Sequence, residues 1–221
     1  MTEAANSAHQ RRLLLRFLIS GTVLALWFWT QTLIGSRVAP ATGLGDALHN
    51  LTAGFNSYFA RNTSAANALL IVSSALIDAL GLFLLGRWLF GGSVRPFFGL
   101  FLLMALRQLM QAICALPPPP NMIWHYPGFP SLLVTYQVAN DFFFSGHTAI
   151  AVFGAMEISR SRGNGLTVLA VLIVIFEVAT VLVLRAHYTM DVFTGIVAAL
   201  WVARFSERVS PRIDQLISGS T

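Results

Sequence analysis

The chain has 221 residues, of which 56% are hydrophobic and only 10% are charged. Soluble domains carry about 25% charged residues, so this composition excludes an ordinary soluble protein and indicates a membrane protein. The formal net charge is +5, but the basic residues, all of them arginine, form no basic face, so no nucleic-acid partner is expected.

Six apolar stretches follow one another along the chain, each about 19–25 residues long and therefore able to cross a bilayer as a helix. The first is too long for the core of a cleaved signal peptide, so it is expected to be a span. No ten-residue alternating segments typical of a membrane barrel occur. We therefore predict an all-α fold, one domain over residues 1–221 with six transmembrane helices at residues 13–34, 66–90, 97–116, 140–158, 166–184 and 186–205.

The arginines divide unevenly between the two sides of such a bundle. If the N-terminus is cytoplasmic, the inner side carries ten arginines and the outer side only Arg37, Arg61 and Arg185. An excess of arginine is typical of the cytoplasmic side of a membrane protein. It predicts a cytoplasmic N-terminus at residues 1–12 and a frayed cytoplasmic tail at 206–221. The arginine bias and the short loops favour a bacterial inner membrane.

Two long connections then lie on the outer side, at residues 35–65 and 117–139. The second begins with four prolines, which cannot continue a helix because proline lacks the N–H donor. It also contains Trp124 and Tyr126, and these residue types favour a membrane interface. We expect this segment to lie over the outer mouth of the bundle.

Two short polar stretches interrupt the apolar pattern, Asp141 to Thr148 (DFFFSGHT) and His187 to Asp191 (HYTMD). Ionisable groups within a span cost about 2.5–3.5 kcal/mol each on insertion scales, and are usually functional or paired. If the fourth helix begins at residue 140, His147 lies about 10 Å below the outer surface. His187 is expected to open the sixth helix, and Asp191, four residues later, shares its face.

A carboxylate beside a histidine fixes the imidazole tautomer and stabilises the imidazolium. Two histidines at one depth suit a two-step displacement at phosphorus. His187 would attack a phosphate ester to give a phosphohistidine-type intermediate, and His147 would protonate the departing alkoxide. An alcohol or water then takes the phosphoryl group. Phosphoryl transfer depends mainly on positioning and charge stabilisation, so Arg107 or Arg185 is expected to face the phosphate oxygens.

Three further residues are candidates for accessory roles. Asp141 and Ser145 lie in the first motif and could contact the substrate phosphate. Glu177 is expected near the level of the histidines, either paired with Arg107 or as an accessory acid or base.

Structural alternatives stand beside each of these roles. Arg107 could form a buried ion pair with Asp78 or Glu177, and Asp78 is expected to be structural. His49 and His125 are expected to be ordinary polar loop residues. A metal held by His147, His187, Asp191 and Asp141 is conceivable, but the sequence has no compact ligand motif. No metal or cofactor is predicted.

At these residues the chain resembles the membrane branch of the type 2 phosphatidic acid phosphatase superfamily. More narrowly, it is similar to the sphingomyelin synthases and the plant phosphatidylcholine:diacylglycerol cholinephosphotransferases. The resemblance covers roughly residues 45–210. It rests on the two histidine motifs and on Arg107 followed by the Leu116-Pro117-Pro118-Pro119 segment. It implies six spans, a catalytic triad of His147, His187 and Asp191, and a site facing the lumen or exterior.

The chain also departs from these families. The wider superfamily has proline where this chain has Phe144, arginine where it has Val181, and lysine where it has Trp88. These differences favour the headgroup transferases over plain phosphatases. Ala186 replaces the acidic residue of the sphingomyelin synthases, so the plant enzyme is the better match.

The sequence therefore predicts a lipid headgroup transferase that moves phosphocholine, or a related phospho-alcohol, from a phospholipid to diacylglycerol or ceramide. A lipid phosphatase or phospholipase-C-like hydrolase would use the same residues, with water as acceptor. A non-catalytic lipid-binding or transport protein is the third reading, although it would need no nucleophile. The sequence leaves the headgroup, the acceptor and the oligomeric state open.

Overall fold

A computed structural model describes residues 2–36, 44–136, 142–160 and 163–218, with side chains from residue 6. The fold is all-helical, and this part of the chain contains no strand. Five helices are long and apolar enough to cross a membrane, so the chain is a multi-pass membrane protein. They are α1 (Thr2–Gly35), α4 (Thr63–Leu89), α5 (Arg95–Ile113), α7 (Asn164–Val183) and α8 (Thr189–Ser218).

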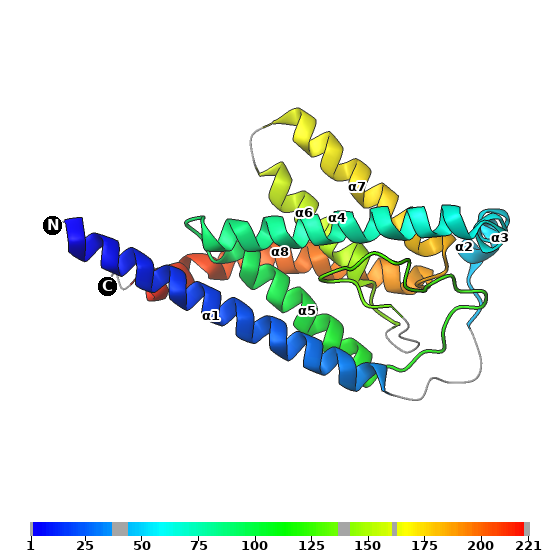
Figure 1. Cartoon of the computed structure of the whole chain (residues 1–221), viewed down its shortest axis with the longest axis horizontal. Helices are drawn as coiled ribbons and strands as arrows, with labels where there is room; N and C mark the ends of the chain where they lie inside the picture. The colour runs from blue at the N-terminus through cyan, green and yellow to red at the C-terminus, as the bar shows by residue number, and fades with distance from the viewer. Residues whose placement is uncertain (1, 37–43, 137–141, 161–162, 219–221) are drawn as a thin grey trace.

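Of the five long helices, α1, α5 and α7 run from one end of the bundle to the other, and α4 and α8 run back (Figure 1). Both chain termini lie at one end, which we call the terminal end. The opposite end holds two short helices that the hydropathy pattern did not predict, α2 (Ala47–Leu51) and α3 (Ala53–Arg61). It also holds the turn between α7 and α8, which contains His187. We call it the histidine end.

The predicted fourth span differs most from the structure. Its helix, α6, covers only Gly146–Ser159, or 14 residues, which rise about 21 Å. Residues 142–145 are not helical. Phe143 has φ +83°, which is incompatible with a helix, and Ser145 caps α6 by accepting the Thr148 N–H. The predicted helix start at residue 140 is therefore wrong, and the depth derived from it for His147 no longer follows.

The last helix also differs from its prediction at both ends. His187 does not open it, because α8 begins at Thr189 and His187 lies in the preceding turn. The predicted frayed tail is wrong as well, because α8 continues to Ser218. Asp214 anchors this extension by accepting hydrogen bonds from the Val94 N–H and the Ser93 hydroxyl at the start of α5.

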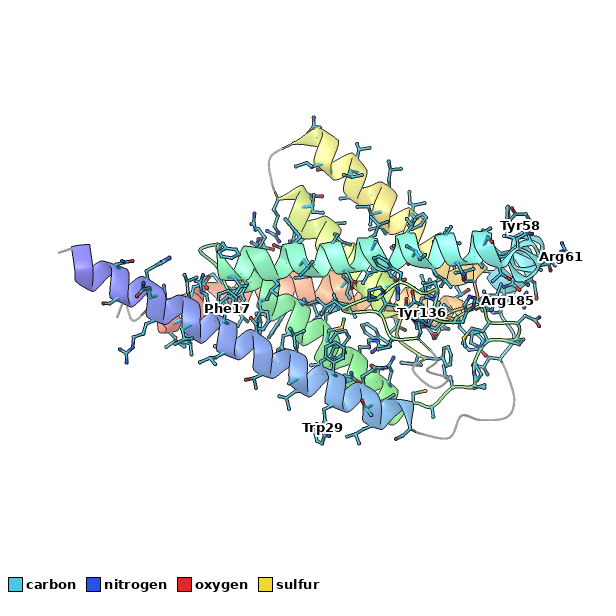
Figure 2. The ribbon with its side chains drawn as sticks, in the orientation of Figure 1. Phe17, Trp29, Tyr58, Arg61, Tyr136 and Arg185 are labelled. Carbon is cyan, nitrogen blue, oxygen red and sulfur yellow. The ribbon has the colours of Figure 1, made fainter. Side chains whose placement is uncertain are left out.

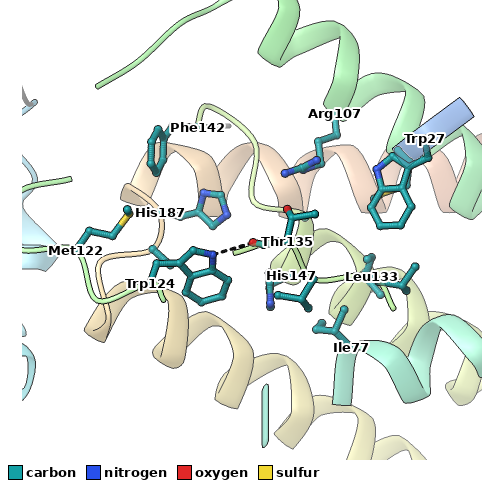
Figure 3. A pocket seen from close by; sticks show the side chains of 15 residues that line it. Trp27, Ile77, Arg107, Met122, Trp124, Leu133, Thr135, Phe142, His147 and His187 are labelled. Atoms are coloured by element: carbon teal, nitrogen blue, oxygen red, sulfur yellow. Dashed lines mark hydrogen bonds between the residues drawn. The ribbon is translucent and has the colours of Figure 1, made fainter. Parts of the chain in front are cut away.

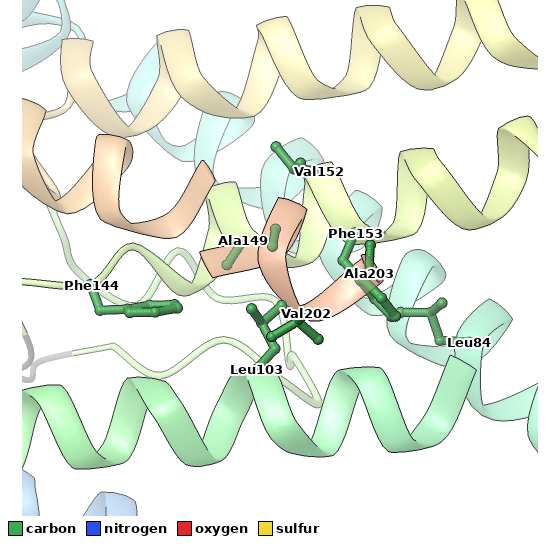
Figure 4. Close-up of a cluster of buried hydrophobic side chains, with 9 residues drawn as sticks. Leu84, Leu103, Phe144, Ala149, Val152, Phe153, Val202 and Ala203 are labelled. Atoms are coloured by element: carbon green, nitrogen blue, oxygen red, sulfur yellow. The ribbon is translucent and has the colours of Figure 1, made fainter. Parts of the chain in front are cut away.

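The core is built around α6, in which ten of the 14 residues are buried. A helix that is apolar on all sides belongs in the interior, and α6 contacts α4, α5, α7 and α8. The central hydrophobic cluster joins four helices and the segment before α6 (Figure 4); its buried members are Leu84, Leu103, Phe144, Ala149, Val152, Phe153, Ala199, Val202 and Ala203. The first turn of α6, with His147, is therefore held by tight packing.

Large apolar side chains point outward from the bundle. Phe17 and Trp29 on α1 are 52% and 61% exposed and project from the helix surface (Figure 2). Similar exposed residues occur on α7, among them Leu172 and Ile175. An outer surface of this kind suits contact with lipid tails.

Candidate active site

His187 and Asp191 meet at the start of α8. The imidazole Nδ1 lies 3.0 Å from the Asp191 Oδ2, and the Asp191 side chain is fully buried. The same oxygen accepts the Tyr188 N–H at 3.1 Å, so the carboxylate also shapes the turn. When Nδ1–H donates to Asp191, the lone pair of His187 lies on Nε2.

Asp191 also joins the two histidine motifs. Its second carboxylate oxygen, Oδ1, accepts the Phe143 N–H at 3.0 Å. Its backbone carbonyl accepts the Ser145 N–H at 3.0 Å. These bonds satisfy the non-helical backbone before α6, where buried polar groups require partners. One aspartate thus fixes both His187 and the entry to the helix that carries His147.

Close helix packing strengthens this junction. Gly195 lies on α8 one turn after Asp191, where a Cβ atom would come 2.7 Å from the Ser145 carbonyl oxygen. Only glycine allows α8 to approach the first turn of α6 this closely. The spacing between the two motifs therefore depends on a residue in neither of them.

His147 occupies the first turn of α6 and is only 8% exposed. Its Nε2 has no hydrogen-bond partner among the described residues. Buried polar atoms are nearly always paired, so this nitrogen is available to a molecule that enters the site.

Both histidines line one cavity with about 30 Å³ of free volume. Figure 3 shows Arg107, His147 and His187 around it, with Trp124 beside His147. Met122, Trp124, Leu133, Val134 and Thr135 form much of the wall. The segment after the four prolines therefore forms one wall of the site and covers part of it. A space of this size holds about one water, so a phospholipid headgroup requires the cover to open.

Arg107 brings positive charge to this cavity. It is 6% exposed, and its Nη1 donates to the Gln31 Oε1 at 2.7 Å. A Cβ atom on Gly146 would lie 3.1 Å from the Arg107 Nε, so the guanidinium packs against the backbone next to His147. Of the two arginines proposed for phosphate contact, Arg107 lines the cavity.

Arg185 takes a different position. Its guanidinium donates to the carbonyl oxygens of Pro120 at 2.8 Å and His49 at 3.2 Å, and it does not line the cavity. Its backbone has φ +55°, a left-handed conformation that costs a non-glycine residue energy. The structure therefore gives Arg185 the geometry of a brace for the turn that carries His187, and it offers no support for phosphate contact.

The buried ion pairs considered for Arg107 do not form with either predicted carboxylate. Asp78 instead accepts the N–H groups of Leu132 and Leu133 and the Ser131 hydroxyl, which supports a structural role. Glu177 is fully buried and accepts the Ser73 hydroxyl at 2.6 Å. It does not line the cavity, so the geometry does not favour a direct acid or base role.

Two of the remaining candidates are placed less directly. Ser145 is fully buried as the cap of α6, which is a positioning arrangement rather than one open to substrate. Asp141 lies outside the described residues. No group of three or more potential metal ligands forms among the residues that the structure describes.

Sequence reasoning missed the support around His187. His49 is buried rather than an ordinary loop residue, because its Nε2 lies 2.9 Å from the His187 carbonyl oxygen. Asp46 accepts the Thr189 N–H at 2.6 Å and caps α2. Burial raises the pKa of Asp46, but hydrogen bonds from Thr189 and His49 together lower it by more, so the pKa lies below its usual value. Two polar residues near an otherwise apolar turn were the available signal.

The position of His125 agrees better with the prediction of a polar loop residue. Its Nε2 lies 2.7 Å from the Asn67 amide oxygen, a polar contact between the covering segment and α4. Gln31 was overlooked altogether, although a glutamine inside an apolar span is itself a signal. It is 4% exposed and holds the Arg107 guanidinium.

Comparison with known proteins adds a family to this geometry. Residues 46–208 match a family model described as AtPDCT1/2, for phosphatidylcholine:diacylglycerol cholinephosphotransferases. The match spans most of the chain and includes both histidine motifs. No curated protein and no solved structure matches the chain. The chain therefore belongs to the phosphatidylcholine:diacylglycerol cholinephosphotransferase family and is a membrane transferase of lipid headgroups.

Proposed function

We propose that the protein transfers phosphocholine, or a related phospho-alcohol, from a phospholipid to diacylglycerol or ceramide, with His187 as nucleophile. The observation that carries the proposal is the buried His187–Asp191 pair, which shares one cavity with His147 and Arg107. A carboxylate on Nδ1 keeps the Nε2 lone pair available for attack. In the type 2 phosphatidic acid phosphatase superfamily, which the chain resembles at these motifs, the residues that match His147, His187 and Asp191 form a catalytic triad.

The first step forms one bond and breaks one. The His187 Nε2 attacks phosphorus, and the bond from phosphorus to the glycerol oxygen of the donor breaks. His147 gives its Nε2 proton to the departing alkoxide, which leaves as diacylglycerol. Arg107 stabilises the negative charge on the phosphate oxygens, the main contribution expected of a protein in phosphoryl transfer.

The second step reverses the first with a new alcohol. His147, now neutral, takes the proton from the hydroxyl of diacylglycerol or ceramide. That oxygen attacks phosphorus and the bond to His187 breaks, which restores both histidines. The small size of the cavity supports transfer over hydrolysis, because a site that admits little water protects a reactive intermediate.

We further propose that α6 makes a sixth crossing and that both termini are cytoplasmic. The helix is too short to span the hydrocarbon alone, so residues 142–145, three of which are buried, would complete its path. Irregular backbone at membrane depth is tolerated when it is buried in protein, and Phe142, Phe144 and Ser145 are all at most 1% exposed. The arginine asymmetry favours a site on the outer side, and the arginine bias and the short loops favour a bacterial inner membrane.

One assay tests the reaction. Purified protein in defined lipid receives choline-labelled phosphatidylcholine, with and without diacylglycerol or ceramide, and the products are separated. Label in a new lipid is the expected result. Soluble phosphocholine as the main product would instead identify a hydrolase, and no turnover with any phospholipid would identify a lipid-binding protein.

A further inference from the structure

Trp124 is the large aromatic residue closest to the proposed chemistry, and its orientation is fixed. Its Nε1 donates to the Thr135 carbonyl oxygen at 3.0 Å, as Figure 3 shows. Its ring meets the His147 imidazole edge to face, with centroids 5.2 Å apart and an angle of 85° between the planes. A phosphate between the two histidines would therefore have this indole as a neighbour.

Two tyrosines of the same covering segment extend the aromatic surface. The Tyr136 ring lies 5.2 Å from that of Trp124, and the Tyr126 ring lies 6.1 Å from that of Tyr136. The Tyr136 hydroxyl is hydrogen-bonded to the Ser74 hydroxyl on α4, which anchors the group to the bundle. Electron-rich ring faces of this kind attract cations, and quaternary ammonium groups in particular.

The fixed charge that lines the cavity is positive. Arg107 provides positive charge from α5. Ser73 is next to Ser74, the residue that anchors Tyr136, and its hydroxyl donates to the fully buried Glu177. One Glu177 oxygen has no hydrogen-bond partner among the described residues. Glu177 does not line the cavity, so Arg107 is the charged side chain that a headgroup phosphate would meet there.

We propose that Trp124, backed by Tyr136, receives the quaternary ammonium end of the headgroup and selects choline-bearing donors over ethanolamine-bearing ones. The assignment rests on the proposed function. A headgroup with phosphate at Arg107 and a cation at Trp124 matches both sides of the cavity. A primary ammonium has N–H donors that need acceptors when it leaves water, whereas a quaternary ammonium has none and loses less in an aromatic site.

The test compares two donors with identical acyl chains, phosphatidylcholine and phosphatidylethanolamine, with diacylglycerol as acceptor. The quantity is the ratio of their kcat/KM values. A cation–π contact worth about 0.5–2 kcal/mol corresponds to a roughly 2- to 30-fold preference. We expect Trp124→Leu to lower the ratio by that factor, and Trp124→Phe, which keeps a smaller ring, to lower it less.

A matched control lies on the same segment. Phe129 is 37% exposed, and Phe129→Leu should leave the ratio unchanged. If Trp124→Leu does not fold, ring-fluorinated tryptophans at position 124 weaken the ring face with little change of shape, and the ratio should fall with each added fluorine.

The outcomes separate this assignment from the function on which it rests. Equal losses for both donors in Trp124→Leu, or no response to fluorination, would show that the indole is only a wall of the cavity. The transferase proposal would survive either result. If the unmodified protein transfers no headgroup from any donor, the proposed function fails, and the headgroup site falls with it.

Discussion

The two ends of the bundle use buried polar groups in different ways. At the terminal end, the buried Glu157 forms ion pairs with Arg95 and Arg160. Arg16 donates to three carbonyl oxygens where α4 ends, and Asp214 accepts N–H and O–H groups where α5 begins. Cations at helix C-termini and carboxylates at N-termini are stabilising, so this end has the pattern of a structural clamp.

At the histidine end, polar groups instead hold irregular backbone around a cavity. The three described non-glycine residues with positive φ, Asn121, Phe143 and Arg185, all lie there. The His147 Nε2 lacks a partner within the described part of the chain. Strained backbone is costly and clusters at functional sites. The comparison separates polar residues that stabilise the bundle from those that prepare a site.

We expect the largest loss of headgroup transfer from a substitution at the histidine end, His187→Ala. Removal of the proposed nucleophile should lower headgroup transfer on the order of 10⁴-fold, because no other described group takes its place beside Asp191. The protein should still insert and fold. Transfer in reconstituted vesicles and thermal unfolding measure the two properties separately. Activity close to that of the unmodified protein would exclude His187 as nucleophile.

Asp191→Asn and Asp214→Asn form a matched pair across the two ends, since each carboxylate accepts backbone N–H groups. Asp191→Asn should lower transfer about 10³- to 10⁴-fold by disturbing the His187 tautomer. Asp214→Asn should cost about 1 kcal/mol of stability, like the loss of a helix cap, with activity per folded molecule unchanged. Similar activities for the two variants would remove the distinction between the ends.

Gly195→Ala tests the spacing of the motifs without touching either of them. The added methyl group would displace the Ser145 carbonyl and the first turn of α6, and a 1 Å error in position costs about 100-fold in rate. The control is Gly86→Ala in α4, where the added methyl group meets nothing within 4 Å. Transfer rates of both variants, normalised to folded protein, provide the measurement; equal rates would argue against the close approach.

Glu157→Gln should affect stability alone. The Glu157 side chain is 1% exposed and has two arginine partners. The substitution removes the carboxylate partner of Arg95, while Arg160 keeps its ion pair with Glu207, and we expect a loss of about 3 kcal/mol. Thermal unfolding in detergent should show a lower Tm, while the transfer rate per folded molecule stays the same. A large loss of activity in fully folded protein would link the clamp to catalysis.

The smallest effect should come from Asp46, which supports the His187 turn through Thr189. Its pKa is lowered on folding, so its contribution to stability is present above the unfolded value of about 3.9 and is lost as pH falls through the folded value. The Tm of the unmodified protein should therefore fall more steeply below about pH 4 than that of Asp46→Asn. Parallel curves for the two proteins would contradict this role.

The sequence predicted the helical class and the long spans because the bilayer imposes length and hydropathy on them. It also identified both histidine motifs, since ionisable residues in apolar surroundings stand out. Arg107 was found for the same reason. These features depend on local composition alone, which a single sequence displays directly.

The prediction failed where contacts between distant residues decide the backbone. The start of α6 depends on bonds from Phe143 and Ser145 to Asp191, and no local pattern marks this pairing. The buried role of His49 likewise depends on a partner 138 residues away. The extension of α8 depends on Asp214 reaching the start of α5. Such long-range hydrogen bonds become visible only once the fold is known.

The most direct test of the central claim is to trap the covalent intermediate. The protein is mixed with choline-labelled phosphatidylcholine in the absence of acceptor, quenched in alkali and digested, and the labelled peptide is identified. We predict acid-labile label on the peptide containing His187, its absence in His187→Ala, and its loss when diacylglycerol is added before the quench. Full transfer activity with no label on His187 at any time would contradict the account.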